Sequence, residues 1–429
     1  MVTRYSRAAV GLAAVAAAVA VAACGTGTQE DTGGSSAGAK VTLTLKHITD
    51  NEPAFTKLIA AYKKVAPNVT IKASYAPVDD LQTSLRAQLG GGGAPDLFVV
   101  WPGNGSAMSV QQLAPTGVLA DLSGADWINN VPENLRGLLG ANGKTYMYSS
   151  GVTPIGAIYN KKVFAEAGIK EPPKTWDELL ATCEKIKAAG KTCIALGNQT
   201  PWITQLIPYA IAPSTAFTQD PNLAQDMLDG KKTFSNSGWR TVFERYLELE
   251  KKGDFNKSPN GTTFEQQQAM VGNGKAAMAV QVLSVLTGIQ DAASNKADID
   301  AFPFPANDQE GELKIPAGVS AGLGANANGK HVEEAKKFVN WLAQPENMAI
   351  YAKLNSSIPL VGSETAELDP IVAPFAKFLT EGKTVPFMDQ QWPNAKVQPA
   401  HFAGVQDLVA GKTDVGNLLK KLDEAYQQK

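Results

Sequence analysis

Apolar and polar positions follow two different periods in the chain after its first forty residues. Residues 41–45 and 69–75 alternate apolar with polar side chains, which predicts two strands. Residues 53–65 and 81–89 place apolar side chains three or four positions apart, which predicts two helices. Residues 96–101 are mostly one apolar run, typical of a strand buried on both faces. Strands that alternate with helices predict parallel pairing.

The same pattern continues to the C-terminal end of the sequence. Thr175 and Glu178 are spaced as a capping box, so we expect a helix to begin there and a strand to follow from Cys193. The apolar spacing predicts one more buried strand at 276–280 and helices at 240–252, 332–342 and 415–426. No repeat of fixed period is present. The pattern therefore predicts a two-lobed α/β protein.

The first 39 residues differ from the rest of the chain. Two arginines precede residues 8–23, which contain only Ala, Val, Leu and Gly, and this predicts that residues 1–23 are a signal peptide. The run ends in Cys24 and resembles the bacterial lipobox, so we expect cleavage before Cys24 and a lipid on its sulfur. Residues 24–39 are then a flexible polar tether. In the alternative, the signal peptide is cleaved near this position, the protein is secreted without a lipid, and Cys24 has no role in anchoring.

Composition narrows the function further. The chain has 39 Lys+Arg and 41 Asp+Glu, a balance that argues against a nucleic-acid partner. No apolar run reaches about 18 residues, so no mature transmembrane helix is expected. The three cysteines and three histidines are scattered, and no metal or other cofactor is expected. In an exported protein the spacing of Cys183 and Cys193 favours a disulfide, with two buried thiols as the alternative.

One motif raises the question of an enzyme. Gly318-x-Ser320-x-Gly322 has the form of a hydrolase nucleophile elbow, and Asp389 and His401 follow it in the order that such enzymes use. An elbow needs a helix directly after the serine, whereas small residues typical of a strand and a loop follow here. We therefore expect no enzyme activity, with a Ser320 hydrolase as the remaining catalytic alternative.

Five motifs occur in an order and spacing that carry a family resemblance. They are a Gly-x-Pro-Asp turn, an apolar-Tyr-Asn-Lys strand end, a Pro-x-Thr-Trp helix start, a Gly-x-x-Ala-Met strand and a Gly-x-Ser-x-Gly crossing, at Gly93–Asp96, Ala157–Lys161, Pro172–Glu178, Gly274–Met278 and Gly318–Gly322. Together they resemble the extracellular solute-binding proteins of ABC importers, in the sugar-binding family that includes maltodextrin-binding protein. The likeness runs from about residue 41 to 426.

The resemblance implies a periplasmic-binding-protein-like (type II) fold with two interleaved lobes, a ligand cleft and hinge closure. By analogy, one lobe takes 40–150 with 302–358, and the other takes 151–301 with 359–429. The chain should cross between lobes near Tyr148–Gly151, Ala301–Phe304 and Ser357–Pro359, and Gly318–Gly322 resembles a return crossing.

Sugar binding needs flat aromatic faces for the C–H face of a pyranose and polar groups for its hydroxyls. Loop and strand-end positions that offer such groups are the expected ligand-binding residues: His47, Asp50, Asn51, Trp101, Asn104, Tyr148, Trp202, Gln281, Ser320 and Trp392. Maltodextrin-binding protein has an aromatic residue shortly after the strand that Gln281 ends, and this sequence has none there. The difference argues against a maltodextrin and favours another or a shorter sugar.

The expected partners follow from the same resemblance. We expect a monomer that binds a carbohydrate, works with the permease of an ABC importer, and is held by its lipid at the outer face of the cytoplasmic membrane of a bacterium, Gram-positive by expectation. The same fold with a polyol, glycerol phosphate or polyamine as its ligand is the alternative. The sequence names neither the sugar nor its linkage.

Overall fold

The computed structural model describes residues 39–363 and 366–428. The predicted signal peptide, Cys24 and all but the last residue of the predicted tether lie outside the described residues. From Lys40 onward the chain forms one compact unit. No helix in the described ranges has the length and apolar character that a membrane span needs.

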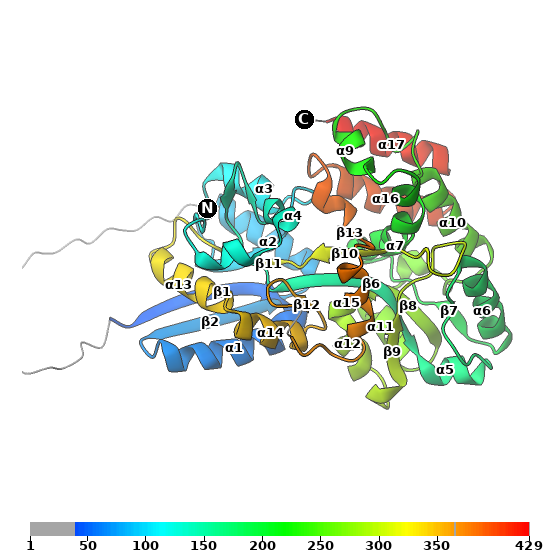
Figure 1. Ribbon diagram of the computed structural model, residues 1–429, viewed down its shortest axis with the longest axis horizontal. Coiled ribbons are helices and arrows are strands. Elements are labelled where there is room, and N and C mark those ends of the chain that lie inside the picture. The colour runs from blue at the N-terminus through cyan, green and yellow to red at the C-terminus, as the bar shows by residue number, and fades with distance from the viewer. Residues whose placement is uncertain (1–38, 364–365, 429) are drawn as a thin grey trace, which may run out of the picture. The chain divides into compact units, whose positions relative to one another are not determined.

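The smaller of the two main sheets has four strands in the order β11-β3-β1-β2. Its strands are β1 Val41–Ile48, β2 Val69–Ala76, β3 Leu97–Val100 and β11 Gly322–Ala325. β1 pairs in parallel with β2 and β3, as predicted, and β11 is antiparallel to β3. The helices around this sheet are α1 Glu52–Val65, α2 Val78–Gly90, α13 Val332–Leu342 and α14 Pro345–Leu354 (Figure 1).

The larger sheet is built around one long strand, β6, whose ten residues are all buried. The order is β13-β10-β6-β8-β7, and β9 and β12 also pair with β6. Its strands are β6 Gly151–Asn160, β7 Thr192–Ile194, β8 Ala276–Val282, β9 Ile299–Phe302, β10 Ile315–Val319, β12 Ile358–Pro359 and β13 Thr384–Val385. Figure 1 shows β6 extending from the side of the smaller sheet into this second layer.

Helices surround the larger sheet and complete the predicted pattern. They are α5 Lys161–Glu166, α6 Trp176–Ala188, α7 Leu206–Ile211, α8 Ala216–Gln219, α9 Leu223–Leu228, α10 Trp239–Lys251, α11 Phe264–Gly272, α12 Leu286–Asp291, α15 Ala373–Thr380, α16 Val397–Val409 and α17 Val415–Gln427. Short elements that follow β3 and precede β6 in the chain are α3 Val110–Leu113, α4 Glu133–Arg136, β4 Gly140–Ala141 and β5 Lys144–Thr145. Each helix and strand expected from the apolar spacing is present.

The chain passes between the two sheets at three places. The first lies before β6, near Tyr148–Gly151, and the last lies at β12. The second differs from the predicted Ala301–Phe304, because β10 pairs with β6 in the larger sheet and β11 pairs with β3 in the smaller one. The chain therefore changes sheet at Ser320 and Ala321, within the Gly-x-Ser-x-Gly stretch.

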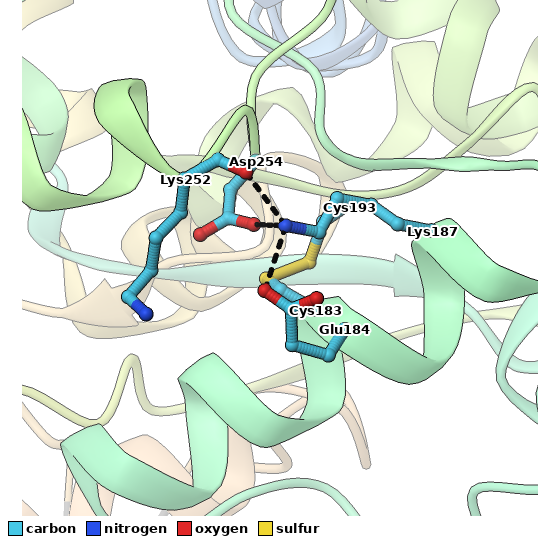
Figure 2. Close-up of a disulfide and its surroundings, with 6 residues drawn as sticks. All are labelled: Cys183, Glu184, Lys187, Cys193, Lys252 and Asp254. Carbon is cyan, nitrogen blue, oxygen red and sulfur yellow. Dashed lines mark hydrogen bonds and ion pairs between the residues drawn. A yellow bond between two sulfur atoms is a disulfide. The ribbon is translucent and has the colours of Figure 1, made fainter.

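Cys183 on α6 and Cys193 on β7 are joined in the structure, with both side chains fully buried and Cα atoms 5.1 Å apart (Figure 2). Beside them, the Lys187 ammonium lies 2.8 Å from a carboxylate oxygen of Asp254, whose side chain is fully buried. Figure 2 shows the same ammonium turned toward Glu184 and the Lys252 carbonyl. The bridge thus ties α6 to the following strand, and the charged cluster ties α6 to the segment that follows α10.

Candidate ligand cavity between the two sheets

A cavity lies between segments that belong to the two sheets. Its walls combine the ends of β1 and β3, the start of α2, the crossing at Ser320, and the segments η5 Pro201–Gln205, η10 Met388–Gln391, α7 and α16. Parallel strands open their carboxyl ends at the sheet edge where α/β proteins bind ligands. The residues that line the cavity come from positions 48 to 402 of the chain.

Asn51 is held at the cavity wall by the buried His47. The Asn51 side-chain amide donates to His47 Nδ1 at 3.1 Å, and His47 Nε2 lies 3.2 Å from the Gly322 carbonyl oxygen. Since the amide nitrogen can only donate, the imidazole proton is on Nε2 and points at the carbonyl. Burial lowers the pKa of His47 to about 3, so the ring is neutral at pH 7. His47 thus positions Asn51 and the strand that crosses at Gly322.

Asp389 presents a carboxylate with one oxygen unused. Its Oδ2 accepts from the Gln398 amide at 3.2 Å, while its Oδ1 is buried and has no hydrogen-bond partner. The hydroxyl of the fully buried Tyr209 lies beside it and acts on its pKa as a hydrogen-bond donor, and it has no other partner. Burial raises the pKa of Asp389 to about 6 and raises that of Tyr209 well above its usual value. A buried polar atom without a partner is costly, so Asp389 Oδ1 is suited to a ligand's donor, and the Tyr209 hydroxyl can also accept from one.

Aromatic rings supply the apolar part of the lining. Trp101 follows β3, and Trp202 lies in η5 with its ring 5.1 Å from that of Phe264. Phe387 and Phe402 line the cavity from η10's start and from α16. Both tryptophans are only half-buried, so part of each ring is exposed. Such faces suit the C–H face of a pyranose.

Two loops from opposite sides of the cavity come into direct contact next to it. The Asn104 side-chain amide donates to the Pro393 carbonyl oxygen at 2.6 Å. A Cβ atom on Gly105 would lie only 2.3 Å from the Asp389 carbonyl oxygen, and one on Gly103 would lie 2.1 Å from that of Gln390. The glycines therefore allow a close backbone approach that closes this side of the cavity.

The serine of the hydrolase-like motif lacks the partners of a nucleophile. Ser320 Oγ lies 2.6 Å from Thr153 Oγ1, and β11 rather than a helix follows it. His401 is fully buried among aromatic rings, and neither of its ring nitrogens has a hydrogen-bond partner. Ser320 and Asp389 do share the cavity, but the three side chains form no relay.

Half of the predicted ligand-binding residues line this cavity and half do not. Those that line it are Asp50, Asn51, Trp101, Trp202 and Ser320. Those outside it are His47, Asn104, Tyr148, Gln281 and Trp392.

Packing explains each residue that lies outside the cavity. Tyr148 is buried in the core beside the smaller sheet, and its hydroxyl donates to the Leu342 carbonyl. Gln281 is fully buried and donates to the Gln267 side chain at 2.6 Å, and Trp392 packs against Tyr209 and Phe234. His47 lies behind Asn51, and Asn104 is used by the contact between the two loops.

Several lining residues were missed by the sequence reasoning. The main ones lie on helices or helical turns and not at predicted strand ends: Asp79, Gln82, Gln205, Tyr209, Asp389 and Gln398. The Gln205 and Gln398 amides lie 3.2 Å apart across two segments distant in sequence. The one available signal was the concentration of polar residues around Trp202 and Trp392, which pointed to these segments but not to the side chains. In the described ranges no group of three or more His, Cys, Asp or Glu side chains is arranged to hold a metal ion.

Sequence comparison gives one family and several relatives. A family model described as "Bacterial extracellular solute-binding protein" matches residues 46–349. The chain is 25% identical over 344 residues to a "Multiple sugar-binding protein" of Streptococcus mutans, which covers 78% of this chain and 79% of that protein. It is 23% identical over 403 residues to the "Melibiose/raffinose/stachyose-binding protein MelE" of Bacillus subtilis, covering 92% and 91% of the two chains.

Solved structures share the fold. A "Chitin oligosaccharide binding protein" superposes with a TM-score of 0.75 at 24% identity, over 90% of this chain and 98% of that one. A structure described as "SBP RafE in complex with raffinose" superposes with a TM-score of 0.73 at 20% identity, over 90% and 99% of the two chains. The two-lobed periplasmic-binding-protein-like fold is thus the fold of this chain.

Proposed function

Because the chain belongs to the bacterial extracellular solute-binding proteins, we propose that it captures a sugar or oligosaccharide in the cavity between its lobes and delivers it to the permease of an ABC importer. The observation that carries the proposal is the lining of the cavity. Half-buried tryptophan side chains line the same cavity as the buried Asp389 carboxylate and Tyr209 hydroxyl, and a sugar ring with its hydroxyls complements both. The relatives and structural neighbours named for sugars support the same ligand class.

The proposal includes how the protein is held and divided. After cleavage at residue 23, a lipid on Cys24 would hold a monomer at the outer face of the cytoplasmic membrane of a Gram-positive bacterium, since two acyl chains suffice for stable anchoring. Residues 24–39 would be the tether. The two lobes would correspond to the two sheets and their helices, and hinge motion at the three crossings would open the cavity. An oxidising exterior would keep Cys183 and Cys193 bonded.

The residues proposed to contact the sugar are those whose groups line the cavity: Asp50, Asn51, Trp101, Trp202, Tyr209, Ser320 and Asp389. A glycerol phosphate ligand is disfavoured, because the lining holds no Lys, Arg or His side chain to bind a phosphate. A sugar needs no such cation. Catalysis is not part of the proposed function.

A ligand screen with two matched variants tests the proposal. Mono- and oligosaccharides are screened by thermal shift and then by calorimetry, and we expect dissociation constants in the micromolar range, about −8 kcal/mol. Trp202→Ala should weaken binding by about tenfold or more, since buried aromatic contacts dominate such sites. The control, Trp341→Ala, removes a half-buried tryptophan outside the cavity and should leave the affinity unchanged. If no carbohydrate shifts the unfolding temperature, the proposed function is wrong.

A further inference from the structure

The lining of the cavity carries charge of one sign only. Asp50, Asp79 and Asp389 contribute carboxylates, and no basic side chain lines the cavity. None of the three takes part in an ion pair within residues 39–363 and 366–428. Burial is the main cause that raises the pKa of each carboxyl. The negative charge of Glu265 raises the pKa of Asp50 further, and that of Asp80 raises the pKa of Asp79. The site is therefore short of positive charge.

The strongest unmet demand lies at Asp389 and Tyr209. Tyr209 is fully buried, lines the cavity and has a hydroxyl oxygen without a hydrogen-bond partner. Asp389 Oδ1 beside it is equally unpartnered, while Oδ2 already accepts from the Gln398 amide. A buried carboxylate oxygen and a hydroxyl that can donate to it and accept from a ligand thus lie side by side on two residues that line the cavity.

We infer that the cavity takes a glycoside with a protonated amine, an amino sugar, whose ammonium group binds between Asp389 Oδ1 and the Tyr209 hydroxyl. This inference rests on the proposed function and specifies its ligand. A sugar hydroxyl would offer one donor and leave the carboxylate charge uncompensated. An ammonium offers three donors together with the missing charge. The faces of Trp101 and Trp202 favour a cation as well as the sugar ring.

The test compares sugars that differ only at one substituent. Glucose, glucosamine and N-acetylglucosamine form one set, the galactose counterparts form a second, and cellobiose with the β-1,4-linked glucosamine disaccharide and its N-acetylated form makes a third. Each is titrated calorimetrically into the protein at pH 6.5, where the amines are protonated, at low and at high salt. Glucuronic acid serves as an anionic probe, and spermidine as an amine without a sugar ring. Asp389→Asn and a matched surface variant, Asp177→Asn, are measured in parallel, with thermal unfolding as the check on folding.

The expected result is that, in the set that binds, the free amine binds at least about tenfold more tightly than both the neutral and the N-acetylated sugar. Salt should reduce that ratio, and Asp389→Asn should bring it to about threefold or less, while Asp177→Asn keeps it. Binding of the neutral sugar as tight as that of its amine would overturn the inference and leave the proposed function intact. If no carbohydrate binds, or if spermidine binds more tightly than every amino sugar, the proposed function fails and the inference fails with it.

Discussion

The bridge between Cys183 and Cys193 should contribute measurably to the stability of the folded body. The two residues are ten positions apart, so the bridge closes a loop of about ten residues in the unfolded chain. On the chain-entropy relation, such a loop corresponds to about 2.7 kcal/mol at 25 °C. With an unfolding entropy of about 2.1 cal/mol/K per residue over roughly 390 residues, the loss corresponds to a fall in Tm of about 3 °C.

The measurement compares the oxidised protein, the same protein fully reduced, and the variant Cys183→Ala with Cys193→Ala. Mass spectrometry after alkylation establishes the state of both sulfurs, which are fully buried and so react only when the protein opens. We expect reduction to lower Tm by about 3 °C. Reductant should leave Tm of the double variant unchanged, because that variant has no bridge to lose. If complete reduction leaves Tm of the native sequence where it was, the entropy argument is refuted for this loop.

Three further changes have predictable outcomes. Gly105→Ala would force the two loops beside the cavity apart, so ligand affinity should fall several-fold, whereas Gly124→Ala adds a methyl group in open space and should not change it. Lys187→Met leaves the buried Asp254 carboxylate without its cation and should lower the unfolding free energy by about 3–5 kcal/mol at pH 7. The loss should shrink as the pH falls, because burial raises the pKa of Asp254 and protonation then removes the unpaired charge. Burial lowers the pKa of His401 to about 3, so protons bind the unfolded chain first and stability falls by about 1.4 kcal/mol per pH unit from pH 6.5 toward pH 3. His401→Met should remove that part of the acid sensitivity in urea titrations at pH 7 and pH 5.

The architecture followed from the sequence because its signals are local. Alternation in residues 41–45 and the apolar run at 96–101 reflect which faces of a strand are buried, and a strand's own residues report that. The helix start at Thr175 also followed, since the Thr175 hydroxyl accepts from the Glu178 backbone N–H at 3.3 Å. The Glu178 carboxylate, however, accepts from the N–H of Lys174 rather than Thr175, one residue earlier than a capping box requires.

The residues that line the cavity were harder to predict, because contacts between segments distant in the sequence decide which side chains reach it. His47 and Asn51 are both polar residues after the same strand, and nothing local separates them. The contact with Gly322, which lies 275 positions from His47, decides that the histidine is inside and that the asparagine is at the wall. Tyr209 shows the reverse case, since it lies on a fully buried helix and still lines the cavity together with the distant Asp389.

The Gly-x-Ser-x-Gly stretch has a steric reason that is independent of catalysis. A Cβ atom on Gly318 would lie 2.4 Å from the ring of Phe387, and one on Gly322 would lie 1.7 Å from the Tyr148 carbonyl oxygen. The first glycine thus makes room for an aromatic ring that lines the cavity, and the second lets two crossing segments meet backbone to backbone. Between them, Ser320 reaches the cavity at the point where the chain changes sheet. The two glycines around Ser320 are therefore explained by close packing where the chain passes from one sheet to the other beside the cavity, and not by a hydrolase elbow.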